Sequence, residues 1–108
     1  MVENNRVKIN HDEETGHVVS FLRSETDLTQ IVFEFNTNKR ASLIKAKVQS
    51  KETSEDTHWT VPVRIRLSPT ATEEVISRQV DALSYESGLP KDQIRAHLDT
   101  ILALPRSN

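Results

Sequence analysis

The chain has 108 residues, of which 35% are hydrophobic and 28% charged, and its formal net charge at pH 7 is −2. This length suits a single domain with one modest core. The absence of cysteine excludes disulfides, thiolate metal sites and a cysteine nucleophile. No run approaches the roughly 18 apolar residues of a membrane span, and no apolar run follows Met1. We therefore expect a cytoplasmic protein that makes no membrane contact.

The first two-thirds of the chain alternates between apolar and polar residues with a period of two, which is typical of β-strands. This pattern predicts strands near residues 5–10, 17–23, 28–36, 41–50 and 58–67. Residues 17–23 are apolar on both sides, which favours a central strand. The connections are short and polar, so hairpins are favoured over crossovers. We expect an antiparallel meander of four or five strands over about residues 5–67.

The segment 58–67 has the clearest alternation in the chain, and it begins with Trp59. Trp59, Val63 and Ile65 are expected to share a buried face, so Trp59 should lie beneath whatever covers the sheet. Pro62 has no amide donor, which predicts an edge strand or a bulge at this position.

The period changes after residue 68 to that of a helix. Thr70 and Glu73 have the spacing of a capping box. Apolar residues then recur at helical spacing over about residues 71–87 and 90–103, with Gly88 as the stop between them and Pro90 in the next first turn. The sequence thus predicts one α+β domain over residues 1–108, an antiparallel sheet followed by an αα-hairpin packed on one face.

The hairpin also has features of a helix-turn-helix. This motif requires a small residue four positions before the turn glycine and apolar residues one and six positions after it. Here these positions are Ser84, Gly88, Leu89 and Ile94. The stretch GLPKDQIRAHLDTI resembles the corresponding stretch of the isocitrate-lyase-regulator family of winged-helix repressors. The resemblance implies that the second helix enters the DNA major groove, with Lys91, Gln93 and Arg95 facing the bases.

The alternative role of the hairpin is to cover the sheet. An apolar sheet face must be buried, and these two helices carry the only amphipathic stripes available. His97 stands where the DNA-binding pattern prefers an apolar residue. No helix breaker lies between residues 72 and 87, so this segment predicts one long helix rather than the two short helices of a three-helix DNA-binding core. Asp92 and Asp99 would oppose phosphate binding. The covering role is therefore favoured.

Residues 37–67 are the basic part of the chain, with seven basic and three acidic side chains. If the two strands in this part are neighbours, Lys45, Lys47, Arg64 and Arg66 share the outer face of the sheet. Such a patch invites an anionic partner such as nucleic acid. We expect no aromatic residue beside it, so binding would be directed at phosphates. The alternative is a solvated face that prevents edge-to-edge aggregation.

The sequence has little that indicates catalysis. Two glycines, at positions 16 and 88, cannot form a phosphate-binding loop, and no Gly-x-Ser-x-Gly elbow is present. His11 and His17 flank an acidic loop, but their spacing matches no zinc or calcium motif. We expect no enzyme activity, no cofactor, no metal site and no small-molecule ligand.

Two functions remain. The first is a small non-catalytic binding or adaptor protein that acts through protein–protein contacts, at an open sheet edge near residues 59–67 or by forming a homodimer that completes a small core. The second is a nucleic-acid-binding or transcriptional regulatory protein that uses the basic sheet face or the C-terminal hairpin. The first is favoured, because the net charge is negative and the basic residues are expected to lack aromatic neighbours.

Overall fold

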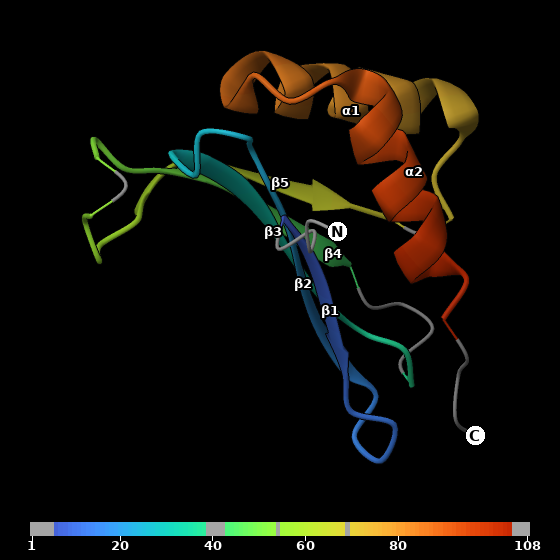
Figure 1. The fold of residues 1–108 in the computed structure, drawn as a ribbon. Helices are drawn as coiled ribbons and strands as arrows, with labels where there is room; N and C mark the ends of the chain where they lie inside the picture. The colour runs from blue at the N-terminus through green and yellow to red at the C-terminus, as the bar shows by residue number, and fades with distance from the viewer. Residues whose placement is uncertain (1–5, 39–42, 54, 69, 105–108) are drawn as a thin grey trace, which may run out of the picture.

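The computed structural model describes residues 6–38, 43–53, 55–68 and 70–104. These residues form one five-stranded sheet followed by two helices (Figure 1). The strands lie side by side in chain order and every neighbouring pair is antiparallel. They are β1 (Val7–His11), β2 (His17–Arg23), β3 (Thr29–Asn36), β4 (Ile44–Ser50) and β5 (Thr60–Leu67). The predicted α+β meander is confirmed, with β2 inside the sheet as expected.

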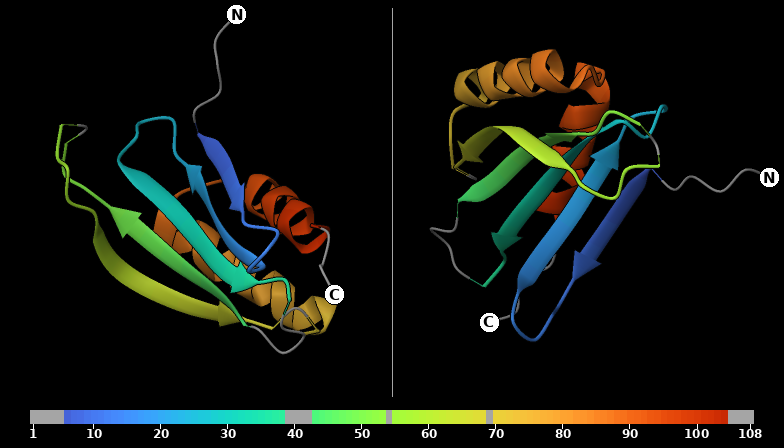
Figure 2. Two further views of the ribbon diagram at one scale, coloured as in Figure 1. Left: turned by 90° about the horizontal axis from the view of Figure 1, so that it is seen from below. Right: turned by 90° about the vertical axis from the view of Figure 1, so that its left-hand side faces the viewer.

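Helices α1 (Glu73–Ser87) and α2 (Lys91–Leu102) lie on the same face of the sheet (Figure 2). Gly88 ends α1 in the left-handed conformation, with φ 75°, and its amide donates to the carbonyl of Ser84 at 2.8 Å. This confirms the predicted stop. The predicted capping box at Thr70 is wrong: the side chain of Thr72 caps α1 by accepting from the amide of Val75.

The core lies between the sheet and the helices, so the covering role of the hairpin is confirmed. Helix α1 packs against β3, β4 and β5. The largest side chain in the core is Phe33, which is 0% exposed. The other members of the core come from every second residue of the inner strands and from the apolar stripes of both helices, among them Leu22, Ile31, Ile44, Val48, Leu83, Ile94, Leu98 and Ile101.

Strand β5 is an edge strand and also carries a bulge, as Pro62 predicts. Val48 pairs with Val63, but Ser50 pairs with Thr60, so two steps along β4 match three along β5. One extra residue turns every preceding side chain to the opposite face of the sheet.

The bulge decides where Trp59 lies. Its indole ring is partly exposed, and it contacts two cations: Nζ of Lys51 is 4.4 Å and Cζ of Arg23 5.6 Å from the ring centroid. The prediction that Trp59 lies beneath the helices is therefore wrong. The alternation that places Val63 and Ile65 toward the core does not continue through the bulge to Trp59.

Candidate functional site

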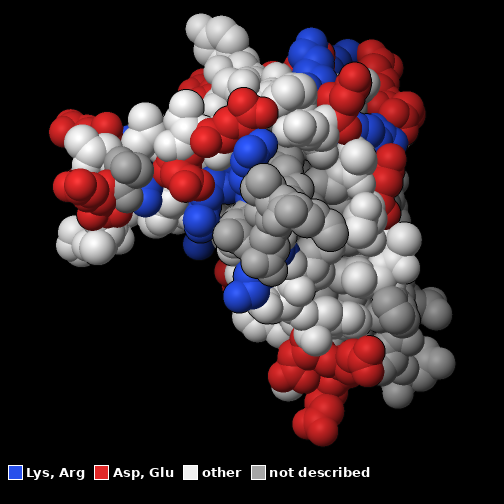
Figure 3. All heavy atoms as spheres, viewed as in Figure 1, with Lys and Arg blue, Asp and Glu red and all other residues white. Residues whose placement is uncertain are grey.

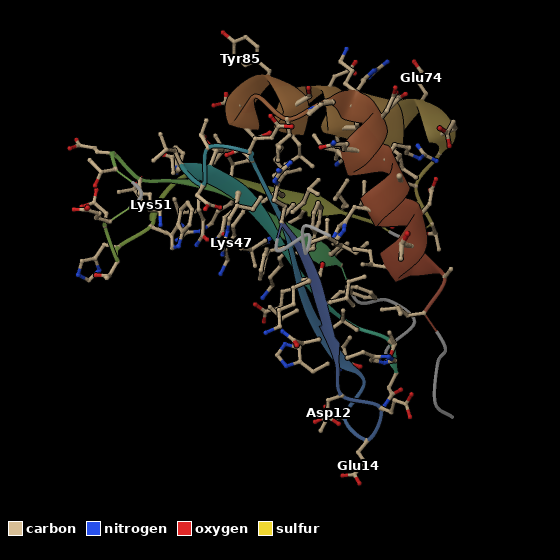
Figure 4. All side chains as sticks on the ribbon, viewed as in Figure 1. Asp12, Glu14, Lys47, Lys51, Glu74 and Tyr85 are labelled. Atoms are coloured by element: carbon tan, nitrogen blue, oxygen red, sulfur yellow. The ribbon has the colours of Figure 1, made fainter. Side chains whose placement is uncertain are left out.

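The face of the sheet turned away from the helices, here called the outer face, carries all four basic residues selected from the sequence. Lys47 pairs across the strands with Arg64, and Lys45 pairs with Arg66. Paired residues project to the same side of a sheet. The right-hand view of Figure 2 looks onto this face, which no helix covers. In Figure 4, Lys47 and Lys51 project from the side of the sheet opposite the helices.

The structure adds aromatic rings and further cations to the outer face. One row of paired residues crosses all five strands: Lys8, Phe21, Val32, Lys47 and Arg64. A neighbouring row contains Arg23, Gln30 and Gln49, and Trp59 lies against Arg23 and Lys51. The expectation that no aromatic residue accompanies the basic patch is therefore wrong.

Sequence reasoning missed these two rings for different reasons. Phe21 lies in a segment that is apolar on both sides, and this pattern already implied one apolar group on the outer face. Trp59 had no such signal, because its side depends on the bulge in β5.

Among the described residues, no carboxylate forms an ion pair within 4.0 Å with Lys45, Lys47, Arg64 or Arg66. Glu34 is the cross-strand neighbour of Lys45. Glu34 also lies on this face, where it is 3.3 Å from His17. Figure 3 shows one group of Lys and Arg over the sheet and another on the helices, with Asp and Glu at the β1–β2 loop, at the β4–β5 loop, on the helices and beside the upper end of the central basic group.

The basic residues of the helices, by contrast, are paired with acidic ones. Nζ of Lys91 is 3.0 Å from Asp81. Arg95 donates two hydrogen bonds to the carboxylate of Glu73, at 2.7 and 2.8 Å, and a third to Asp99. The hydrogen bond to Glu73 raises the pKa of Arg95 above its ordinary value. Of the three predicted DNA-recognition residues, only Gln93 is exposed without such a contact.

A buried polar pair joins α2 to the sheet. Nε2 of His97 and Oγ of Ser20 are hydrogen-bonded at 2.9 Å, and the His97 ring lies 5.1 Å from that of Phe33, centroid to centroid. Ser20 is 0% exposed, so its hydroxyl is not accessible to a substrate. The pair therefore fixes α2 on the sheet. The sequence signal for it was His97 in the apolar stripe of Ile94, Leu98 and Ile101.

Burial lowers the pKa of His97 below its ordinary value. The unfolded chain, whose histidines titrate near about 6.5, then takes up this proton at a higher pH than the folded protein does. The free energy of unfolding should therefore fall as the pH decreases below about 6.5, until the pKa of folded His97 is passed. Urea denaturation between pH 7.5 and 5 measures this dependence.

The test variant is His97→Gln. For one proton, the slope lost in this variant is at most about 1.4 kcal/mol per pH unit. Equal slopes in wild type and His97→Gln would contradict the assignment, and an NMR titration of the His97 ring provides a check that needs no substitution.

A groove of about 780 Å³ lies between β1 and α2, on the inner side of the sheet. Its lining includes apolar side chains of both elements and of the interhelical turn, among them Val7, Ile9, Leu22, Leu89, Pro90 and Ala96. Val7 is 41% exposed, so the helices leave this margin of the sheet uncovered. The groove borders the free edge of β1.

The acidic β1–β2 loop is organised by Asp12 (Figure 4). Its carboxylate accepts hydrogen bonds from the amides of Glu14 and Thr15, and these bonds lower its pKa. No group of three or more potential metal ligands is found in the described part of the chain.

Comparisons with known proteins give no further guide to the site. No protein-family model, no curated protein and no solved structure matches the chain. Within the described residues, neither helix is long and apolar enough to span a membrane.

Proposed function

We propose that the protein binds single-stranded nucleic acid on the outer face of its sheet, through phosphate contacts with little sequence preference. The observation that carries this proposal is the set of four cations on β4 and β5, which form no ion pair among the described residues although Glu34 lies opposite Lys45. Lys45 and Lys47 face Arg66 and Arg64 directly, and like charges at such positions destabilise a sheet. A polyanion would offset this repulsion and release its own counter-ions on binding.

The aromatic rings favour a single strand over a duplex. Phe21 and Trp59 lie on the same face as the cations, and proteins that bind single strands combine such rings with a basic surface that follows the backbone. Lys45 and Lys47 are two residues apart, which spaces them by about 7 Å along the strand. Phosphates of an extended chain can follow such a row of cations.

The test is a binding titration with single-stranded DNA and RNA oligonucleotides over a range of salt concentrations. Four phosphate contacts to a single strand should give a slope of log affinity against log salt of about −3. A duplex of equal length should bind more weakly, because its bases are not available for stacking. Equal affinity for the duplex would contradict the single-strand assignment, and no binding even at low salt would contradict the function.

A second candidate function is binding of a protein segment or of a second copy of the chain. Strand β1 favours it, because the groove borders its free edge and, unlike β5, this edge has neither a proline nor a bulge. Protein contacts at the edge near residues 59–67, as expected from the sequence, are disfavoured by Pro62. Under this function, light scattering should show self-association or a protein complex, and nucleic acid should not bind at about 150 mM salt.

A further inference from the structure

Arg23 has an unusual environment on the outer face. Its guanidinium carbon lies 4.5 Å from the ring centroid of Phe21 and 5.6 Å from that of Trp59. The Nε group of Arg23 donates to Oε1 of Gln30 at 3.0 Å, and Nε2 of Gln30 donates to Oε1 of Gln49 at 2.6 Å. The guanidinium is thus held by two rings and by a chain of amides that crosses β2, β3 and β4.

The two terminal nitrogens of this guanidinium have no partner among the described residues. Only Nε is used, by Gln30, so the four N–H groups on Nη1 and Nη2 remain available. A planar guanidinium donates two parallel hydrogen bonds to a phosphate or a carboxylate. Because the side chain is already fixed, binding would cost little further side-chain entropy.

We propose that Arg23 is a preorganised binding site for one phosphodiester group of a single strand, with Phe21 and Trp59 as its aromatic walls. This proposal rests on the proposed function and adds a residue that the four-cation patch does not contain. The outer face favours phosphate over carboxylate, because a chain of phosphates can engage Arg23 together with Lys47 and Arg64 in the neighbouring row.

The variant Arg23→Lys tests the proposal because it keeps the charge and removes the planar fork. The affinity for a labelled single-stranded oligonucleotide, measured by fluorescence anisotropy, should fall about tenfold at about 150 mM salt. The salt slope should stay unchanged, because the number of cations is the same. The matched control is Arg78→Lys, the same exchange at an exposed arginine of α1 outside the outer face, which should bind within about twofold of wild type.

Trp59 is the only tryptophan of the chain, so its fluorescence reports directly on this site. Oligonucleotide binding should change the emission of wild type, and change it less in Arg23→Lys. Urea denaturation of both variants establishes that they are folded.

The outcomes separate the two proposals. If wild type binds and Arg23→Lys loses no more affinity than Arg78→Lys, the role of Arg23 is wrong and the proposed function stands. If wild type binds no nucleic acid, both are wrong. If polyglutamate binds as tightly as the oligonucleotide and loses affinity equally in Arg23→Lys, the ligand is a carboxylate segment and the phosphate assignment is wrong.

Discussion

Replacement of Lys45, Lys47, Arg64 and Arg66 together by glutamine is expected to lower the affinity for single-stranded nucleic acid by about 100-fold at ~0.15 M salt. The reason is counter-ion release: each contact to a single strand contributes about −0.7 to the salt slope, so four contacts account for a slope of about −3. The variant should therefore bind with a slope reduced to about −0.7, the contribution of the remaining contact at Arg23. Anisotropy titrations at several salt concentrations measure both quantities.

The control compares two variants that lose the same number of positive charges from different parts of the surface. Lys47→Gln with Arg64→Gln and Lys91→Gln with Arg78→Gln remove two positive charges each, the first pair from the outer face and the second from the helices. Only the first double variant should lose affinity and slope. Equal losses would mean that net charge, and not this face, controls binding.

The stability of the four-residue variant is a second measurement of interest. Removal of like charges that face each other across β4 and β5 should leave the free energy of unfolding unchanged or raise it. A fall in affinity with unchanged stability would place the effect at the surface rather than in the fold.

Replacement of Phe33 by alanine is expected to lower the free energy of unfolding by about 3–5 kcal/mol. Phe33 is 0% exposed, lies on the central strand and contacts His97 of α2, so its removal leaves a cavity at the junction of sheet and helices. The total free energy of unfolding of a small domain is about 5–15 kcal/mol, so the variant should be close to unfolding.

Urea denaturation followed by circular dichroism measures this loss. The matched control is Tyr85→Ala, because Tyr85 is 86% exposed on α1 (Figure 4). Its removal should change the free energy of unfolding by no more than about 0.5 kcal/mol. A loss below 1 kcal/mol in Phe33→Ala would contradict the packing described for the core. Phe33→Leu keeps most of the volume and should retain a measurable transition if the alanine variant does not fold.

Local patterns in the sequence were sufficient for the elements of this fold. The β-branched and aromatic residues of 17–23 and the alternation in residues 28–36 predict β2 and β3 within one residue at each end. Gly88 predicts the end of α1, because only glycine adopts its left-handed backbone without strain. The covering role of the hairpin followed from an apolar sheet face that had to be buried.

In the candidate site, the grouping of the basic residues was predictable from the sequence, but the ion pairs between the helices were not. Lys45, Lys47, Arg64 and Arg66 share a face because they alternate on neighbouring strands, so their grouping needed only the meander. The ion pairs Arg78–Glu74 and Arg95–Asp99 have the i,i+4 spacing of one helix face. The pair of Arg95 with Glu73 was not predictable, because it joins the two helices. The first residue of α1 was also not fixed by the sequence. Thr70 and Thr72 are both suitable caps, and the path of the chain selects Thr72.

The sequence by itself therefore determined the order and type of the elements and the side of the sheet on which the basic residues lie. The tertiary structure alone decided that Trp59 and Arg23 meet beside those residues. Pro62 predicted an irregularity, but the side that Trp59 faces depends on how β5 pairs with β4 beyond the bulge. One extra residue reverses the alternation, and only cross-strand pairing shows where that residue is accommodated.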